Sequence, residues 1–388
     1  MKHLFNFLKK FFIFVAIIYL IFAYYQQPKR VHIFVDYATS PTVLQMVKFI
    51  KLPEKDIKII AWDRYRYRDI IIKKRNIQQN VIDVSGILRS SLSNKYQTMS
   101  YIINSIESSN NNTIYEIHLN YKHIGWFGLH FFKLIPPHKI KQVHLYEDGL
   151  GTLYKEINDK KIQNNGINYA KEFLIEIQKS IPAHYHPNNY VFTLPMYYPT
   201  TLHTSIAHKV KDIEKRPYYK KFKKLTIEPV DFRAFKTELS PVEKTKLYNL
   251  LGINFLSIHQ KMQKGKPFGI FLWDGYDLPK RYKTIEQLLD KMEEHSKKHG
   301  TIWFSKNHPT AFKPYLPRPF LKPLPAHFPM EVLLLSDYPF QYVAGAGSSA
   351  FYSVKPEEIV AFIPNHRYGY IQSLLNLGIL EEDKIYRW

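Results

Sequence analysis

Strand-like and helix-like segments alternate in two long stretches of this chain, and that pattern constrains its fold more than any other feature. Short apolar, β-branched runs are expected as strands at 31–35, 57–62, 114–119, 140–146, 268–273, 301–305, 341–344 and 359–363. Segments compatible with helix are expected at 40–50, 98–108, 124–134, 167–179, 285–299, 330–336 and 370–377. Strands that alternate with helices form βαβ units and parallel sheets. The sequence therefore predicts an α/β fold.

A Pro-, His- and Tyr-rich stretch from about 181 to 217 separates the two halves of this pattern. Single hydrophobic cores rarely grow beyond about 250–300 residues, and the chain has 388. We expect a first domain at 30–185, a linker region at 186–225 and a second domain at 226–388. Ligands of such sheets bind beyond the carboxyl ends of the strands, so a cleft between the domains is the expected binding region.

The N-terminal segment, residues 1–28, is predicted to be a membrane anchor. Lys2, Lys9 and Lys10 precede an uncharged, apolar run at 11–25. That run would span about 22 Å as a helix, and residues 4–8 extend it toward a hydrocarbon core of about 30 Å. A signal peptide is the alternative, but the run ends without a small-x-small cleavage site, which favours an uncleaved anchor.

Charge points to an anionic partner. The chain has 55 Lys and Arg against 33 Asp and Glu, a net charge of +22. Because the basic residues are spread along the chain and no nucleic-acid-binding module accompanies them, we expect no nucleic acid as partner. An acidic membrane surface or an anionic substrate remains. There is no cysteine, which excludes disulfides, thiolate nucleophiles and Cys-ligated zinc.

The first of three motifs that follow expected strands is Glu147-Asp148-Gly149. A carboxylate at a strand end can take a proton from a hydroxyl when partial burial raises its pKa. The alternative is an ordinary acidic turn, since such residues are common where strands end. On the motif alone, the turn is the favoured reading.

The second motif, Lys306-Asn307-His308-Pro309, places an imidazole where it could hydrogen-bond a phosphate. In the third, Gly345-Ala346-Gly347-Ser348-Ser349, glycines admit a ligand close to the backbone and two serines offer donors to an anion. A helix N-cap explains one of these serines equally well. No His-Glu-x-x-His, Asp-x-Asp or Gly-x-Ser-x-Gly motif is present, so the sequence signals neither a zinc hydrolase nor a metal-dependent transferase.

Taken in this order, the motifs resemble those of the bacterial sialyltransferases of glycosyltransferase family 80. That family carries an acidic-Asp-Gly motif, a Lys-x-His-Pro motif and a Ser-Ser pair preceded by a Glu-Val-Leu segment, matched here by Glu331-Val332-Leu333. The resemblance extends to Phe34-Val35-Asp36, to Ile117-His118-Leu119-Asn120 with His123, and to the C-terminal Tyr386-Arg387-Trp388. It covers about residues 31–388 and is poor across the linker.

The resemblance implies a GT-B-like fold, with two Rossmann-like domains facing a central cleft. It implies inverting transfer of sialic acid, without a metal or other cofactor, from the co-substrate CMP-sialic acid to a galactose-terminated glycan or glycolipid, with lipooligosaccharide the expected acceptor. Two alternatives remain. The donor could carry another CMP-activated ulosonic acid, or the chain could be an inactive, membrane-tethered glycan-binding relative.

The family's functional residues carry over to matching positions of this chain. The implied catalytic residues are Asp148, as the base that deprotonates the acceptor hydroxyl, and His308, which assists departure of CMP. The implied donor-binding residues are Lys306, Pro309, Glu331, Ser348 and Ser349. The implied acceptor-binding residues are Asp36, His123 and Trp273, of which Trp273 differs from the family in its neighbours. Because CMP-sialic acid is made in the cytosol of such bacteria, we expect a cytoplasmic catalytic domain anchored to the inner membrane.

Overall fold

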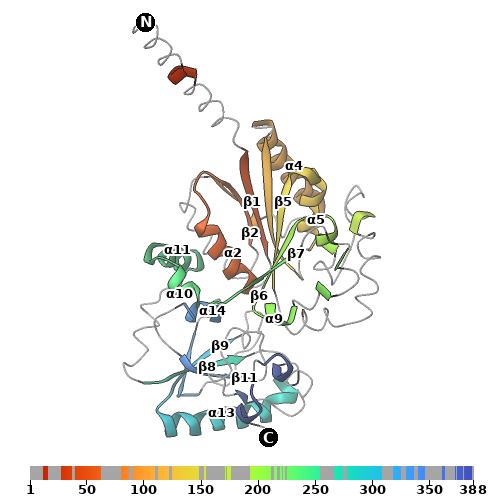
Figure 1. Ribbon diagram of the computed structural model, residues 1–388. Helices are drawn as coiled ribbons and strands as arrows, with labels where there is room; N and C mark the ends of the chain where they lie inside the picture. Colours follow the sequence, from red (N-terminus) through yellow and green to blue (C-terminus); the bar gives the residue numbers. More distant parts are fainter. Residues whose placement is uncertain are drawn as a thin grey trace.

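A computed structural model of the chain contains two parallel β-sheets with helices around them (Figure 1). The structure describes residues 12–15, 28–36, 40–62, 80–86, 91–109, 112–121, 125–147, 153, 171, 173–175, 193–210, 214–215, 219–220, 222, 225–253, 266–273, 278–307, 318–324, 329–335, 340–345, 361–362, 372, 374–378 and 380–386.

The first sheet has seven parallel strands in the order β3-β2-β1-β4-β5-β6-β7. Their bounds are β1 Lys29–Asp36, β2 Ile57–Trp62, β3 Val81–Asp83, β4 Thr113–Asn120, β5 Ile140–Tyr146, β6 Thr200–Thr204 and β7 Leu225–Pro229. All of β2, and β1 from Val31 onward, are buried. This burial explains why both strands are largely apolar rather than alternating, with His32, Asp36 and Lys58 as buried polar exceptions, since parallel sheets are covered on both faces.

Helices cover both faces of this sheet. On one face lies α2 (Ser40–Lys51), whose Phe49 ring meets Phe34 of β1 edge-on. On the other lies α4 (Leu92–Ser109), where Glu107 accepts a hydrogen bond from the Tyr115 hydroxyl of β4. Helix α5 (Gly125–Leu134) packs against α4. A 3-10 turn, η2 (Pro137–Lys139), then leads into β5, and η3 (Leu194–Met196) precedes β6.

The second sheet has four parallel strands in the order β10-β9-β8-β11. Their bounds are β8 Phe268–Trp273, β9 Ile302–Asn307, β10 Leu321–Pro323 and β11 Phe340–Gly345. The long amphipathic helix α13 (Leu278–His299) precedes β9, and its Leu288, Leu289 and Met292 pack in one cluster with Phe271 and Trp303 of the sheet. A separate parallel pair joins β12 (Ala361–Phe362) to β13 (Ile385–Tyr386), after η9 (Glu382–Lys384).

Helix α2 also connects the two halves of the molecule. The short helices α9 (Ala207–Val210) and α10 (Phe235–Glu238) precede α11 (Pro241–Leu251), which packs against α2, and α14 (Met330–Leu333) of the second half also contacts α2. Lys51 at the end of α2 forms an ion pair of 3.2 Å with Glu238 of α10. One hydrophobic cluster consequently runs from the first sheet into the second half.

The predicted α/β fold with two parallel sheets is confirmed, but the predicted linker at 186–225 is wrong. That stretch contains β6, which lies inside the first sheet between β5 and β7, and β7 begins at its end. The first sheet is therefore complete only at Pro229. Strand β6 reads Thr-Thr-Leu-His-Thr, without the apolar run that marks the other central strands, and the prolines around it suggested a connection.

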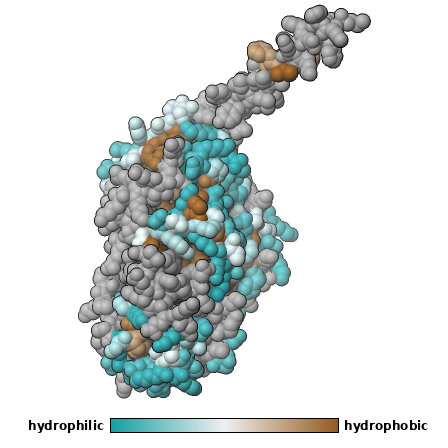
Figure 2. All heavy atoms as spheres, turned by 90° about the vertical axis from the view of Figure 1, so that its left-hand side faces the viewer, coloured by the Kyte–Doolittle hydropathy of each residue, from teal (hydrophilic) through white to brown (hydrophobic). Residues whose placement is uncertain are grey.

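The predicted N-terminal anchor lies almost wholly outside the described residues. Of its apolar run the structure describes residues 12–15, the short red helix in Figure 1, which is exposed and brown in Figure 2. Among the described residues, no helix combines the length and the apolar character that a membrane span requires.

Candidate functional site

The carboxyl ends of the central strands carry a hydrogen-bonded polar group. Asp36 is the last residue of β1 and is fully buried, and its carboxylate accepts hydrogen bonds from Asn120 Nδ2 at 3.0 Å and from Thr42 Oγ1. Asn120 ends the neighbouring strand β4, and Thr42 lies in the first turn of α2. Buried charge of this kind persists in folded proteins when it is hydrogen-bonded, so Asp36 is fixed in place at the strand edge.

The acidic motif begins directly after β5, and the structure describes only its first residue. Glu147 is buried, and its Oε2 accepts a hydrogen bond of 2.9 Å from the Ser205 amide and another from the Thr204 hydroxyl. These contacts hold Glu147 against the end of β6. Asp148 and Gly149 lie outside the described residues, so the predicted catalytic base stays a prediction.

In the second sheet, the ends of β8, β9 and β11 carry predicted site residues. Lys306 and Asn307 are the last two residues of β9, and Asn307 pairs in register with Trp273, the last residue of β8. For Trp273, the structure describes the backbone but not the side chain. Gly345 ends β11 so close to β8 that an added Cβ would lie 2.7 Å from the backbone oxygen of Leu272. A glycine is therefore required where the chain enters the Ser348–Ser349 motif.

Glu331 is the remaining donor-side residue within the described residues. It lies in the first turn of α14 and is buried, and α14 contacts α2 of the first half. The predicted site residues His123, His308, Pro309, Ser348 and Ser349 lie outside the described residues. The structure therefore places Asp36 at the carboxyl ends of the first sheet's strands and Lys306 and Trp273 at the carboxyl ends of the second sheet's strands. Glu331 lies on α14, the helix beside α2.

The carboxyl ends of the first sheet's strands lie on the side nearer the second sheet. In Figure 1, β1 starts beside the N-terminal segment and ends on the side of the first sheet that is nearer the second sheet. Because all strands of the first sheet are parallel, Asp36, Asn120 and Glu147 share that edge. Ligands of open α/β sheets bind at such edges.

A row of buried or partly buried histidines across the first sheet was not foreseen from the sequence. His32, His118, His144 and His203 lie on β1, β4, β5 and β6, and the rings of His118 and His144 stack 4.5 Å apart. Burial lowers the pKa of His118 well below its usual value. Hydrogen bonding to His144 lowers the pKa of Glu116 to about 2, against the opposing effect of burial. A signal was present, since each of four strands carries one histidine, but their pairing requires the strand register.

Comparison with known proteins identifies the fold. No protein-family model matches the sequence, and no curated protein matches it. Among solved structures, the α/β-galactoside α-2,3-sialyltransferase of Photobacterium phosphoreum is similar, with 20% identity, a TM-score of 0.67 and coverage of 93% of this chain and 99% of that chain.

Two further Photobacterium enzymes agree with this likeness. The GT-B domain of the Photobacterium damselae sialyltransferase has 17% identity and a TM-score of 0.67, covering 92% of this chain and 100% of that one. A 2,6-sialyltransferase of Photobacterium sp. JT-ISH-224, solved with CMP and lactose, has 14% identity and a TM-score of 0.67. The match covers 93% of this chain and 78% of that chain. At these identities the likeness establishes a GT-B-like fold shared with sialyltransferases.

Proposed function

We propose that the chain is an inverting sialyltransferase. It moves sialic acid from CMP-sialic acid to the galactose end of a glycan or glycolipid, and the transfer step uses no metal. One observation carries the proposal: three motifs resembling those of sialyltransferases begin at the ends of β5, β9 and β11, in a fold similar to that of solved sialyltransferases. One of those neighbours was solved with CMP and lactose, a donor product and an acceptor substrate.

On the acceptor side, Asp148 removes the proton from the attacking galactose hydroxyl. The hydroxyl oxygen then bonds to the anomeric carbon of sialic acid as the bond from that carbon to the CMP phosphate oxygen breaks. The contacts of Glu147 support Asp148 as the base, because the carboxylate of Glu147 already accepts hydrogen bonds from Thr204 and Ser205. His123 and Trp273 line the acceptor, and Asp36 lies on the same side of the site.

On the donor side, His308 with Ser348 and Ser349 stabilises the CMP phosphate as it departs. Loss of CMP passes through an oxocarbenium-like state, so stabilising the leaving phosphate matters more than a strong nucleophile. Lys306 lies near the base, Pro309 shapes the loop after it, and Glu331 binds the ribose hydroxyls. The end of β9 and the first turn of α14 place Lys306 and Glu331 in the half of the molecule that carries the Ser-Ser motif.

The N-terminal segment anchors the enzyme to the inner membrane of a bacterium, with the catalytic domain in the cytoplasm. The net charge of +22 favours this arrangement, because a basic protein is attracted to the anionic surface that would hold a lipid-linked acceptor such as lipooligosaccharide. A liposome flotation assay with anionic and neutral vesicles tests it. Loss of binding to anionic vesicles when residues 1–28 are deleted is the expected result, and undiminished binding would contradict it.

A comparison of two variants tests the chemical assignment. Asp148→Asn is expected to reduce CMP release at least about 100-fold, the lower range for a general base, while CMP affinity stays close to that of the wild-type protein. His308→Ala is also expected to slow turnover strongly. If Asp148→Asn turns over at the wild-type rate, Asp148 is not the base. Activity with another CMP-activated ulosonic acid alone would assign a different donor, and binding of a glycan without any CMP release would indicate a glycan-binding relative.

A further inference from the structure

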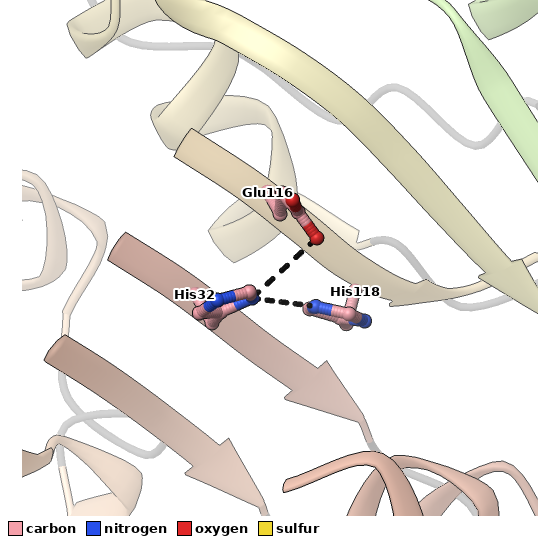
Figure 3. Close-up of side chains that lie close together, drawn as sticks. All are labelled: His32, Glu116 and His118. Carbon is pink, nitrogen blue, oxygen red and sulfur yellow. Dashed lines mark hydrogen bonds and ion pairs between the residues drawn. The ribbon is translucent and has the colours of Figure 1, made fainter. Parts of the chain in front are cut away.

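Three side chains of the types that bind transition metals converge inside the first sheet, beneath α2. His32 of β1 and Glu116 and His118 of β4 point toward one another in Figure 3, and their ligand atoms all lie within 4.8 Å of each other. His32 Nδ1 lies 3.4 Å from His118 Nε2 and 3.6 Å from Glu116 Oε2. Within the part of the chain that the structure describes, this is the one group of its kind.

These separations match the spacing of ligands around zinc. With bonds of about 2.0–2.1 Å to nitrogen and oxygen, two ligands of a tetrahedral zinc ion lie about 3.3–3.4 Å apart. As a direct N–H···N hydrogen bond, 3.4 Å would be long, because such bonds are about 2.7–3.2 Å. The contact between His32 and Glu116 at 3.6 Å is also too long for a hydrogen bond. The geometry therefore fits a shared central ion better than direct bonds.

The outward nitrogens of both histidines have oxygen partners, as metal-binding histidines usually do. His32 Nε2 lies 3.3 Å from Asp56 Oδ2, and His118 Nδ1 lies 2.9 Å from the Tyr146 hydroxyl. Such partners fix the ring orientation and leave the inward nitrogen with a free lone pair. The tautomers that suit Asp56 and Tyr146 as acceptors are those that direct both lone pairs toward the centre.

His144 lies beside this group but outside it. Its ring is stacked parallel to that of His118, with centroids 4.5 Å apart, so the two rings cannot both direct a lone pair at one ion. Instead, His144 Nε2 lies 3.5 Å from Glu116 Oε2, and its other ring nitrogen lies 3.0 Å from His203 Nε2. His144 therefore helps to position the carboxylate of Glu116 from outside the group.

The charges nearby favour a cation, on balance. Glu116 and Asp56 place two carboxylates beside an ion of charge +2, in surroundings where His118 is fully buried. The positive charge of Lys48 on α2 disfavours a bound cation, because it acts on His32, His118 and His144. Paired or metal-coordinating charges are the ones that tolerate such burial.

We propose that His32, Glu116 and His118 are the three protein ligands of one zinc-like divalent transition-metal ion. The ion joins β1 to β4 in the middle of the first sheet and is structural. His32 lies four residues before Asp36, about 13 Å along the strand, so this ion is separate from the strand edge where transfer is proposed. The inference is independent of the proposed function, and the transfer step remains free of metal.

Metal analysis of the full chain, purified with a tag that lacks histidine, tests the inference. We expect about one zinc per chain after dialysis against metal-free buffer, and a lower unfolding temperature when a chelator removes it. Glu116→Gln is expected to lose the zinc, and Asp56→Asn to weaken binding about 10–100-fold. His130→Leu, which replaces a buried histidine outside the cluster, should keep it.

Cobalt provides a readout that does not depend on the as-purified state. Wild-type protein unfolded in urea and refolded with one equivalent of Co²⁺ should show the visible absorption of tetrahedral cobalt, and Glu116→Gln should not. Absence of both zinc and a cobalt spectrum in the wild-type protein would overturn the inference. So would equal metal content in wild type and Glu116→Gln, which would indicate an adventitious ion only. Metal content does not depend on sialyl transfer, so the two proposals fail separately.

Discussion

His130 makes the folded chain sensitive to acid, and its substitution provides a quantitative test of the packing between α4 and α5. The ring is fully buried on α5 and meets Tyr96 of α4 edge-on, with centroids 5.3 Å apart. Neither ring nitrogen has a hydrogen-bond partner. Burial, and then the charges of Lys133 and Lys95, lower the pKa of His130 from 6.5 to about 4.

The sign and size of the effect follow from these values. Because the pKa of His130 is lower in the folded protein, the unfolded chain binds more protons between about pH 6.5 and 4, and stability falls as the pH falls through that window. A difference of about 2.5 pKa units corresponds to about 3 kcal/mol at the acid limit. About 2 kcal/mol of this is lost between pH 7.5 and pH 5.

His130→Leu removes this titration at similar side-chain volume. Urea unfolding of wild type and variant at pH 7.5, 6.5, 5.5 and 5.0 gives the difference in unfolding free energy at each pH. We expect this difference to change by about 2 kcal/mol in favour of the variant on going from pH 7.5 to 5. Other buried histidines remain in both proteins and cancel in the comparison. A difference that stays constant with pH would show that His130 is not neutral and buried as described.

Two further substitutions test the strand ends. Gly345→Ala is expected to destabilise the chain by about 1–3 kcal/mol, because the new Cβ would overlap the backbone oxygen of Leu272. The control is Gly86→Ala, whose new Cβ would meet nothing within 4 Å and should change stability by less than about 0.5 kcal/mol. Equal effects of the two substitutions in urea unfolding would refute the packing argument. Glu147→Ala is expected to cost about 2–3 kcal/mol, because the buried Thr204 hydroxyl loses its charged acceptor. An unchanged unfolding midpoint would show that this contact does not hold the turn after β5.

Much of the fold could be predicted because hydrophobic burial dominates its central strands. The expected strands at 57–62, 140–146 and 268–273 match β2, β5 and β8 in full. Helix boundaries were less accurate: the helix expected at 98–108 begins at Leu92, because its first turns are polar and carry no apolar periodicity. Strand β6 was missed for the related reason that three of its five residues are threonine.

The site was predictable only in part, because side-chain partners depend on register between strands that are distant in sequence. The strands β5, β9 and β11, at whose ends the three motifs begin, were expected close to their observed positions. The hydrogen bond from Asn120 to Asp36 joins residues 84 positions apart in the sequence, and it follows from the pairing of β1 with β4. The same pairing brings His32 opposite Glu116. Neither contact has a signature within one strand.

The most direct test of the proposed function is product analysis after incubation of the purified chain with CMP-sialic acid and lactose. Mass spectrometry of the sugars, with CMP measured in the same reaction, should show sialyllactose and CMP formed in equal amounts, in the presence of a chelator as well as in its absence. Asp148→Asn should form neither at a comparable rate. Intact lactose with no CMP released beyond spontaneous hydrolysis, from a folded protein that retains residues 1–28, would contradict the proposal that this chain transfers sialic acid to galactose.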